Sequence, residues 1–289
     1  MGALAKALRE ATRRLAEAEV PSPRHDAEAL AAHVLGTDRA SVALAAARGD
    51  DVDPGARFDE LVDERARRVP LQHLVGTAPF RDLGLDVGPG VFVPRPETEV
   101  VAQPAVDEAA ALVAAGRRPV VVDLCTGSGA LALAVATEVP ESEVHAVELS
   151  EQAHAWAARN VARWAPGLDL RLGDAAGSFP ELDGSVDVVV SNPPYVPPHS
   201  EPVDPEVRDH DPEIALYGGG PDGLAVPRLV VAAAARLLRP GGLLVVEHAD
   251  VQQRALLATL TSSGAWRDEA GHTDLTGRAR YVTARRAAS

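Results

Sequence analysis

The stretch Asn192-Pro193-Pro194-Tyr195 carries the clearest chemistry in this sequence. It follows an apolar run over 186–190 that predicts a buried strand, and the two prolines prevent that strand from continuing. A proline has no backbone N–H to donate, so the turn offers only acceptors, and the Asn192 side-chain oxygen adds another. Such a turn beside an aromatic ring suits the NH2 group of a planar substrate, such as an amide or a nucleobase amine. The alternative interpretation is a tight turn that only ends a strand.

A second polar turn lies between a predicted strand over 119–124 and a predicted helix over 130–139. Glycines at this place let a ligand approach the N-terminus of the helix. The residues of this glycine turn are Cys125, Thr126, Gly127, Ser128 and Gly129. The next strand, over 144–148, ends in Glu148, which is placed to accept hydrogen bonds from ribose hydroxyls. Neither the usual dinucleotide fingerprint nor a Walker lysine is present here. We therefore expect a nucleoside site, with Cys125 as a small buried residue rather than a nucleophile.

Strands and helices alternate from about residue 119 onward, which predicts an α/β protein with a doubly wound, mostly parallel sheet. Ligands of such sheets bind at the carboxyl ends of the strands, so the glycine turn, Glu148 and Asn192 should converge. We expect a strand over 243–247 after a turn at 239–242, and one antiparallel strand over 279–284. A long polar loop over 196–220 is expected to be functional or mobile.

The N-terminal third has the apolar spacing of helices from Ala3 to about Val69. We expect a small helical bundle over 1–78 that docks a partner or covers the next domain, with Asp38 or Ser41 capping its third helix. Residues 79–95 surround Gly88-Pro89-Gly90 and predict a β-hairpin connector, and 96–289 form the remaining domain. Arg95 lies between two prolines, which makes it a candidate for a fixed electrostatic contact.

Composition narrows the classes of function. The 289 residues carry a formal net charge of -14, which argues against a surface built to grip nucleic-acid phosphates. Cys125 is the only cysteine, so no internal disulfide can form, and we expect a cytoplasmic protein. No apolar stretch reaches the length of a membrane span without charges, and His25 and His33 lack partners for a metal site. We therefore expect no membrane association and no metal.

Together these motifs resemble the class I S-adenosylmethionine-dependent methyltransferases, and most closely the bacterial glutamine methyltransferases of peptide chain release factors. The resemblance rests on residues 70–76, 93–99, 123–131, 192–195, 215–223 and 277–281. It implies S-adenosylmethionine as cofactor, S-adenosylhomocysteine as product, and a five-helix N-terminal domain that helps to hold the release factor. It also implies methyl transfer to the glutamine amide nitrogen of the Gly-Gly-Gln loop. We expect a monomer whose partners are release factors, without direct contact to nucleic acid.

The resemblance also assigns residues to the site. The cofactor is expected to contact the glycine turn, Glu148, Asn192, and two residues that follow the third strand, Asp174 and Ala175. Cys125 stands where the family more often has glycine, Glu148 where aspartate is usual, and Ala175 where some members have tryptophan.

On the substrate side, Asn192 Oδ1 and the Pro193 carbonyl would each accept one amide hydrogen. Tyr195 would pack on the amide plane, and Pro194 and Arg95 complete the expected substrate site.

Three alternatives stay open at this point. The same turn serves enzymes that methylate amines in nucleic acid, and a sibling enzyme methylates a glutamine in a ribosomal protein. A third interpretation is a cofactor-binding scaffold without catalytic activity. The net charge weighs against the first alternative, and the acceptor-only turn at Asn192 weighs against the last.

Overall fold

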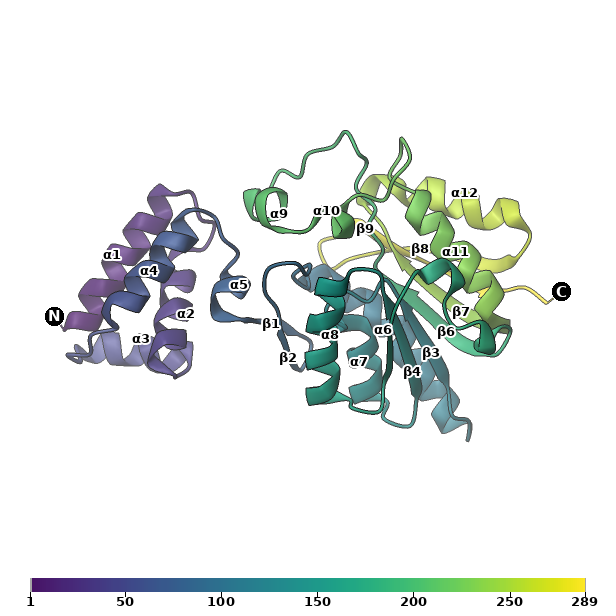
Figure 1. The fold of residues 1–289 in the computed structure, drawn as a ribbon, viewed down its shortest axis with the longest axis horizontal. Coiled ribbons are helices and arrows are strands. Elements are labelled where there is room, and N and C mark those ends of the chain that lie inside the picture. The colour runs from purple at the N-terminus through teal and green to yellow at the C-terminus, as the bar shows by residue number, and fades with distance from the viewer. Residues whose placement is uncertain (1, 289) are drawn as a thin grey trace. The chain divides into compact units, whose positions relative to one another are not determined.

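The computed structural model describes residues 2–288, which fall into two compact units (Figure 1). One unit, here called the helical unit, contains the chain up to Thr77 together with Pro202–His210. The other, here called the sheet unit, contains Ala78–Glu201 and Asp211 onward. The segment Pro202–His210 therefore belongs with the N-terminal helices, although it lies far from them in sequence.

Short helices around one apolar core make up the helical unit. Along the first helix Leu4, Leu8 and Leu15 are buried on one face, as helical periodicity requires. The Asp38 carboxylate accepts a hydrogen bond from the Ser41 N–H at 2.8 Å, so Asp38 is the predicted cap. The helices are α1 (Ala3–Glu17), α2 (Pro23–Leu35), α3 (Arg39–Arg48), α4 (Gly55–Ala66), α5 (Leu71–Val75) and α9 (Pro205–His210).

Within the described residues, the main sheet of the sheet unit has seven strands in the order β5-β4-β3-β6-β7-β9-β8. Strand β9 runs antiparallel to both of its neighbours, and the remaining pairs are parallel. This confirms the predicted α/β doubly wound sheet with one antiparallel strand. The strands are β3 (Val120–Leu124), β4 (Glu143–Glu148), β5 (Asp169–Leu172), β6 (Val186–Ser191), β7 (Leu238–Glu247), β8 (Trp266–Thr273) and β9 (Ala279–Arg286).

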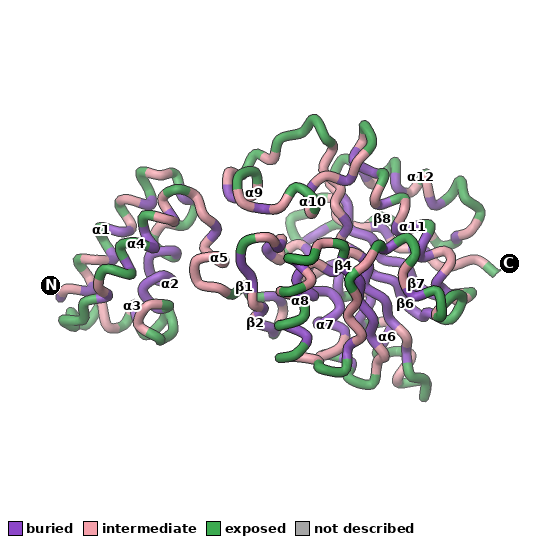
Figure 2. The backbone as a smooth tube through the Cα atoms, in the orientation of Figure 1, coloured by how far each residue is buried: buried purple, intermediate pink, exposed green. Residues whose placement is uncertain are grey.

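Helices cover both faces of this sheet, and the central strands are buried on both sides (Figure 2). Side chains alternate between the two cores, with Val188 and Val190 facing one and Val189 the other. The first core is covered by α6 (Pro96–Ala114), α7 (Ala130–Glu138) and α8 (Glu151–Trp164). The second is covered by α11 (Ala225–Leu237) and α12 (Gln253–Ser263). The short helices η1 (Ala175–Gly177) and η2 (Pro180–Leu182) lie between β5 and β6, and η3 (Asp250–Gln252) directly precedes α12.

A polar residue interrupts the apolar run of β6, and the structure accounts for it. Asp187 is buried at the start of the strand, where it accepts hydrogen bonds from Arg117 Nη2 at 2.8 Å and the Val120 N–H at 2.9 Å. Its charge is also paired with Arg239. The buried carboxylate is thus satisfied and joins β6 to its two neighbours β3 and β7.

The hairpin that precedes the sheet is present, but its turn is not where the sequence places it. Strands β1 (Thr77–Phe80) and β2 (Leu83–Asp86) form a two-stranded sheet whose turn is Arg81 and Asp82. Arg81 takes a left-handed conformation at φ 51°, which a residue of this type seldom adopts. Gly88 instead permits a close approach, because a Cβ there would lie 2.4 Å from the Trp156 ring.

Two further expectations need correction. Strand β7 begins at Leu238 rather than 243, because Leu238 pairs with Val186 before a register shift that leads to the pair Val188 and Leu243. The predicted loop over 196–220 is partly structured: it contains α9 and α10 (Glu213–Leu216). Its two ends are joined in the sheet unit, where Val196 forms a parallel bridge with Tyr217.

Candidate active site

Asn192 follows directly after β6 and is held by a residue of α6. Its amide nitrogen Nδ2 donates a hydrogen bond to Thr98 Oγ1 at 3.3 Å. Thr98 is buried in the first turn of the helix, which begins at Pro96 as prolines favour. Within residues 2–288, no hydrogen bond uses Asn192 Oδ1 or the Pro193 carbonyl oxygen. The turn therefore presents acceptors, as its sequence predicts.

The Tyr195 side chain is anchored by its hydroxyl. The O–H donates to Glu247 Oε1 at 3.2 Å, and burial raises the pKa of the Tyr195 phenol. Glu247 is the last residue of β7 and is buried, and this burial raises its carboxyl pKa to about 7. The hydroxyl of Thr98, the charge of Arg280 and the Tyr195 hydroxyl act in the opposite direction. One carboxyl group thus lies against both the helix and the tyrosine of the turn.

Backbone packing fixes the Asn-Pro-Pro-Tyr turn from the other side. A Cβ on Gly223 would lie 2.2 Å from the Tyr195 carbonyl oxygen, and one on Gly218 would lie 2.5 Å from the Pro194 oxygen. Gln252 Nε2 donates to the Tyr195 carbonyl at 2.7 Å and to the Asp222 carbonyl at 2.8 Å. Gly218 and Gly223 are therefore required for the close contact that keeps the turn in shape.

The glycine turn connects β3 to α7 and is held by two buried carboxylates. Asp123 accepts from Thr126 Oγ1 at 2.6 Å and the Ala132 N–H at 3.1 Å, and burial raises its pKa to about 7. Glu148, at the end of β4, accepts from the Gly127 N–H and the Ser150 N–H, each at 2.8 Å. Each carboxylate oxygen has further lone pairs, so Glu148 keeps acceptor capacity for ribose hydroxyls.

Cys125 adopts a backbone conformation that favours glycine. Its φ is 62°, in the left-handed region that glycine enters without strain. Burial, together with the nearby carboxylates of Glu148 and Asp123, raises the pKa of its thiol. A thiol held protonated in this way is a poor nucleophile, but Cys125 is half-buried rather than buried as predicted.

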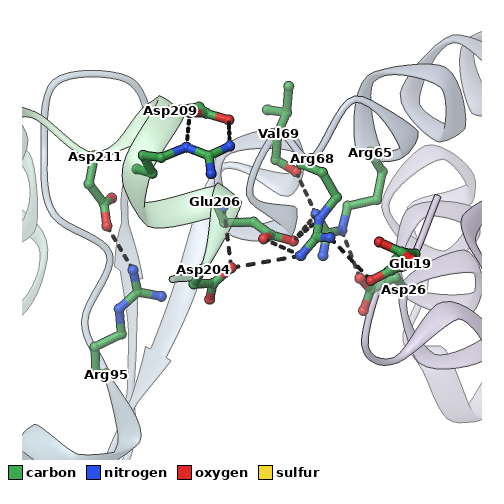
Figure 3. A network of polar contacts seen from close by, with 11 residues as sticks. Glu19, Asp26, Arg65, Arg68, Val69, Arg95, Asp204, Glu206, Asp209 and Asp211 are labelled. Carbon is green, nitrogen blue, oxygen red and sulfur yellow. Dashed lines mark hydrogen bonds and ion pairs between the residues drawn. The ribbon is translucent and has the colours of Figure 1, made fainter. Parts of the chain in front are cut away.

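The other predicted residues lie as follows. Asp174 is exposed and caps η1 by accepting from the Ala176 N–H at 2.9 Å, and Ala175 is buried in the second core. Arg95 Nη2 donates to the buried Asp211 carboxylate at 2.7 Å (Figure 3). Its guanidinium also lies 4.9 Å from the centre of the Phe92 ring. The guanidinium of Arg95 is therefore already paired with a residue of its own unit.

Several structural residues of the site were not predicted. Thr98 and Glu247 lie against the Asn-Pro-Pro-Tyr turn, and Gln252 supports its backbone. Asn160 of α8 is fully buried: its side chain bonds the Asp86 N–H and carbonyl at 2.7 and 3.0 Å and the Ser128 carbonyl at 2.9 Å. The only sequence signal for any of them was the position of Thr98 within Pro-Glu-Thr-Glu. The adjacent acids there indicate an ordinary helix start, so the threonine was not singled out.

The described residues form neither a metal cluster nor a membrane-spanning helix. In the described residues, no group of three or more histidine, cysteine, aspartate or glutamate side chains is arranged to hold a metal ion. None of the helices between residues 2 and 288 is long and apolar enough to cross a membrane.

The strand order, the glycine turn after β3 and the carboxylate after β4 define a class I methyltransferase. A family model described as a methyltransferase domain matches residues 121–204, and one described as the PrmC N-terminal domain matches 6–76. A release factor glutamine methyltransferase of Streptomyces coelicolor is 53% identical over 99% of both chains, and one of Mycolicibacterium smegmatis is 50% identical over 100% of this chain and 99% of its own. The chain belongs to the release factor glutamine methyltransferase family.

A third relative carries a different name. The 4-amino-L-phenylalanine/4-methylamino-L-phenylalanine methyltransferase of Streptomyces pristinaespiralis is 43% identical over 91% of this chain and 89% of its own. The methyl donor of this chain is S-adenosylmethionine. The residues present fit that cofactor, because Glu148 offers a rigid carboxylate at a strand end and the glycine turn opens a helix N-terminus beside it.

Proposed function

We propose that this chain transfers a methyl group from S-adenosylmethionine to the side-chain amide nitrogen of the glutamine in the Gly-Gly-Gln motif of peptide chain release factors, and so modulates translation termination. The observation that carries the proposal is the pair of acceptors at the Asn-Pro-Pro-Tyr turn, Asn192 Oδ1 and the Pro193 carbonyl, which have no partner within the described residues. Family membership supplies the substrate class, since the relatives named above are release factor glutamine methyltransferases.

The residues act by positioning and electrostatics. An amide nitrogen is a weak nucleophile because its lone pair is delocalised into the carbonyl group. Two acceptors that each bind one N–H hold the nitrogen in place and stabilise the positive charge that develops as the nitrogen attacks. Tyr195, whose hydroxyl is tied to Glu247, offers its ring to the amide plane. The bound cofactor supplies the electrophilic methyl group.

We assign the remaining residues in the same way. The glycine turn from Cys125 to Gly129, together with Glu148 and Asn192, is proposed to hold the cofactor, with Asp174 and Ala175 near its adenine. Pro194 and Arg95 are proposed to border the substrate. The domain limits 1–78, 79–95 and 96–289 and the monomeric state are part of the same proposal.

The helical domain is proposed to dock the release factor. A truncated chain is a poor test, because Glu206, in the returning segment 202–210, is paired with Arg65 and Arg68 (Figure 3). The full chain should instead be compared on an intact release factor and on a short Gly-Gly-Gln peptide. Docking predicts a much higher KM for the peptide with a similar kcat, and equal KM values would refute it.

The reaction is tested directly with purified release factor and labelled S-adenosylmethionine. Label should appear in the release factor and disappear when the glutamine of its Gly-Gly-Gln motif is replaced. Parallel reactions should contain ribosomal protein, ribosomal RNA and 4-amino-L-phenylalanine, the last because a 43% identical relative is named for it. Methylation of one of these substrates without the release factor would overturn the proposal.

A further inference from the structure

The chemistry proposed at Asn192 depends on which end of its side-chain amide faces the substrate. An asparagine amide can turn by 180°, which exchanges an acceptor for a donor at nearly the same place. If Nδ2 faced the substrate, two NH2 groups would meet and the site would reject its amide. The sequence of the turn does not determine this orientation, so a neighbouring group has to.

Thr98 is the neighbour that distinguishes the two ends. Its Oγ1 accepts the hydrogen bond from Asn192 Nδ2 at 3.3 Å, which leaves Oδ1 for the substrate. A hydroxyl has a single proton, and it serves as acceptor without competition only when that proton is directed elsewhere. Thr98 is 3% exposed, so water is a poor acceptor for its hydroxyl proton.

Glu247 provides the acceptor for this proton. Its Oε1 accepts from Tyr195, whereas Oε2 is buried and no donor among residues 2–288 reaches it at full hydrogen-bond geometry. The Thr98 hydroxyl is near enough to this carboxyl to lower its pKa as a hydrogen-bond donor. A chain of hydrogen-bond donation, here called the relay, then runs from Asn192 Nδ2 to Thr98 and from Thr98 to Glu247.

We propose that Glu247 and Thr98 are positioning residues that hold the Asn192 amide with its oxygen toward the substrate NH2. This inference rests on the proposed function for its effect on turnover, but the orientation itself is a property of the free chain. The three residues come from the end of β7, the first turn of α6 and the residue after β6. The Pro-Glu-Thr-Glu segment thereby acquires a role through its threonine.

The direction of donation depends on the charge of Glu247. As a carboxylate it accepts from Thr98, but once protonated it donates, and Thr98 then donates to Asn192 and favours the flipped amide. Arg280 and the hydroxyls of Thr98 and Tyr195 favour the carboxylate, whereas burial and Glu97 favour the protonated form. The structure therefore predicts that turnover falls as the pH drops below about 7.

The first test uses Thr98→Val, which keeps the shape and removes the hydroxyl. We expect about a tenfold loss in kcat/KM, as one hydrogen bond allows, with cofactor affinity unchanged in calorimetry. Thr98→Ser should restore most of the loss. The matched control is Thr137→Val, which should keep full activity. The Thr137 hydroxyl donates to the Leu133 and Ala134 carbonyls of its own helix.

Two further measurements separate positioning from a general structural role. In an Asn192→Asp background both ends of the side chain are oxygens, so Thr98→Val should cost far less than in the unmodified chain. Glu247→Gln should abolish the fall in turnover below pH 7. An equal loss from Thr98→Val in both backgrounds, or an unchanged pH profile in Glu247→Gln, would overturn the inference.

A readout without turnover keeps this inference distinct from the proposed function. In NMR spectra of asparagine-labelled chain, the Asn192 NH2 resonances should shift as Glu247 titrates, and this shift should vanish in Thr98→Val. If no release factor is methylated but the titration is seen, the proposed function fails and the relay stands. If methylation is normal and the resonances do not respond, the relay is wrong.

Discussion

The segment Pro202–His210 gives the most quantitative prediction. The Glu206 side chain is paired with two arginines, and the residue is 8% exposed (Figure 3). Its carboxylate lies 2.7 Å from Arg65 Nη1 and accepts hydrogen bonds from Arg68 Nε at 2.8 Å and Arg68 Nη2 at 2.5 Å. Breaking a buried ion pair by removal of one partner costs about 3–5 kcal/mol. Both arginines keep other acceptors, since Arg65 bonds Asp26 at 2.8 Å and Arg68 bonds the Glu19 carbonyl at 3.1 Å. The lower end of the range, about 3 kcal/mol, therefore applies to Glu206→Gln.

This loss should appear as local opening of α9 rather than as global unfolding. At about 1.4 kcal/mol per factor of ten, amide exchange at Val207 and Arg208 should accelerate about 100-fold. Glu201→Gln, an exposed change in the same loop, is the control and should leave exchange unchanged. Unaltered protection in Glu206→Gln would refute the assignment of this segment to the helical unit.

The pH dependence of the same contact has a definite sign. Burial acts to raise the pKa of the Glu206 carboxyl, but the hydrogen bonds with Arg68, Asp204 and Arg65 hold it well below its usual value. A carboxyl whose pKa is lowered on folding stabilises the folded form fully above its unfolded pKa of about 4.3. The protection from amide exchange that this contact gives to α9 should therefore be constant from pH 7 to about 5. It should decrease only below that range.

Four other substitutions, at three positions, test the cofactor side of the site. Cys125→Gly should change the free energy of unfolding by less than about 1 kcal/mol in denaturant titrations, whereas Cys125→Val should lower it by about 2 kcal/mol, because β-branched residues tolerate φ 62° poorly. Asn160→Ala leaves three backbone groups without a partner and should lower the same free energy by about 3 kcal/mol; a loss below about 1 kcal/mol would show that water replaces the side chain. Glu148→Ala should weaken S-adenosylmethionine binding by about 1–3 kcal/mol in calorimetry, and unchanged affinity would place the ribose elsewhere.

Local signals determined most of the fold that the sequence predicts. Apolar runs such as 186–190 mark buried strands, and prolines 193 and 194 mark where β6 ends, because both effects operate between near neighbours. The hairpin turn was misplaced for the same reason. Gly88 resembles a turn residue, but it leaves room for the Trp156 ring. Trp156 is distant in sequence, so no local pattern predicts this contact. Arginine is not a typical turn residue, although Arg81 adopts a left-handed turn conformation.

The site was predictable where one motif contains the chemistry and not where the fold assembles it. Asn192 and Glu148 follow strands whose ends must converge in a doubly wound sheet. Thr98 and Glu247 are 94 and 52 residues away from the side chains that they bond, Asn192 and Tyr195. Such pairs depend on how α6 and β7 pack on β6, which no spacing rule supplies.

The central claim is that Asn192 Oδ1 is an acceptor for the substrate amide, and one rate comparison tests it most directly. Asn192→Ala should be compared with the unmodified chain on an intact Gly-Gly-Gln release factor, with cofactor binding measured by calorimetry on the same samples. Loss of one aligned group in a dry site typically costs about 10²–10³ in rate. The account predicts a fall in kcat of that size with only a modest change in cofactor affinity, because Asn192 is also proposed to contact the cofactor. Methylation by Asn192→Ala at near the unmodified rate would contradict the account.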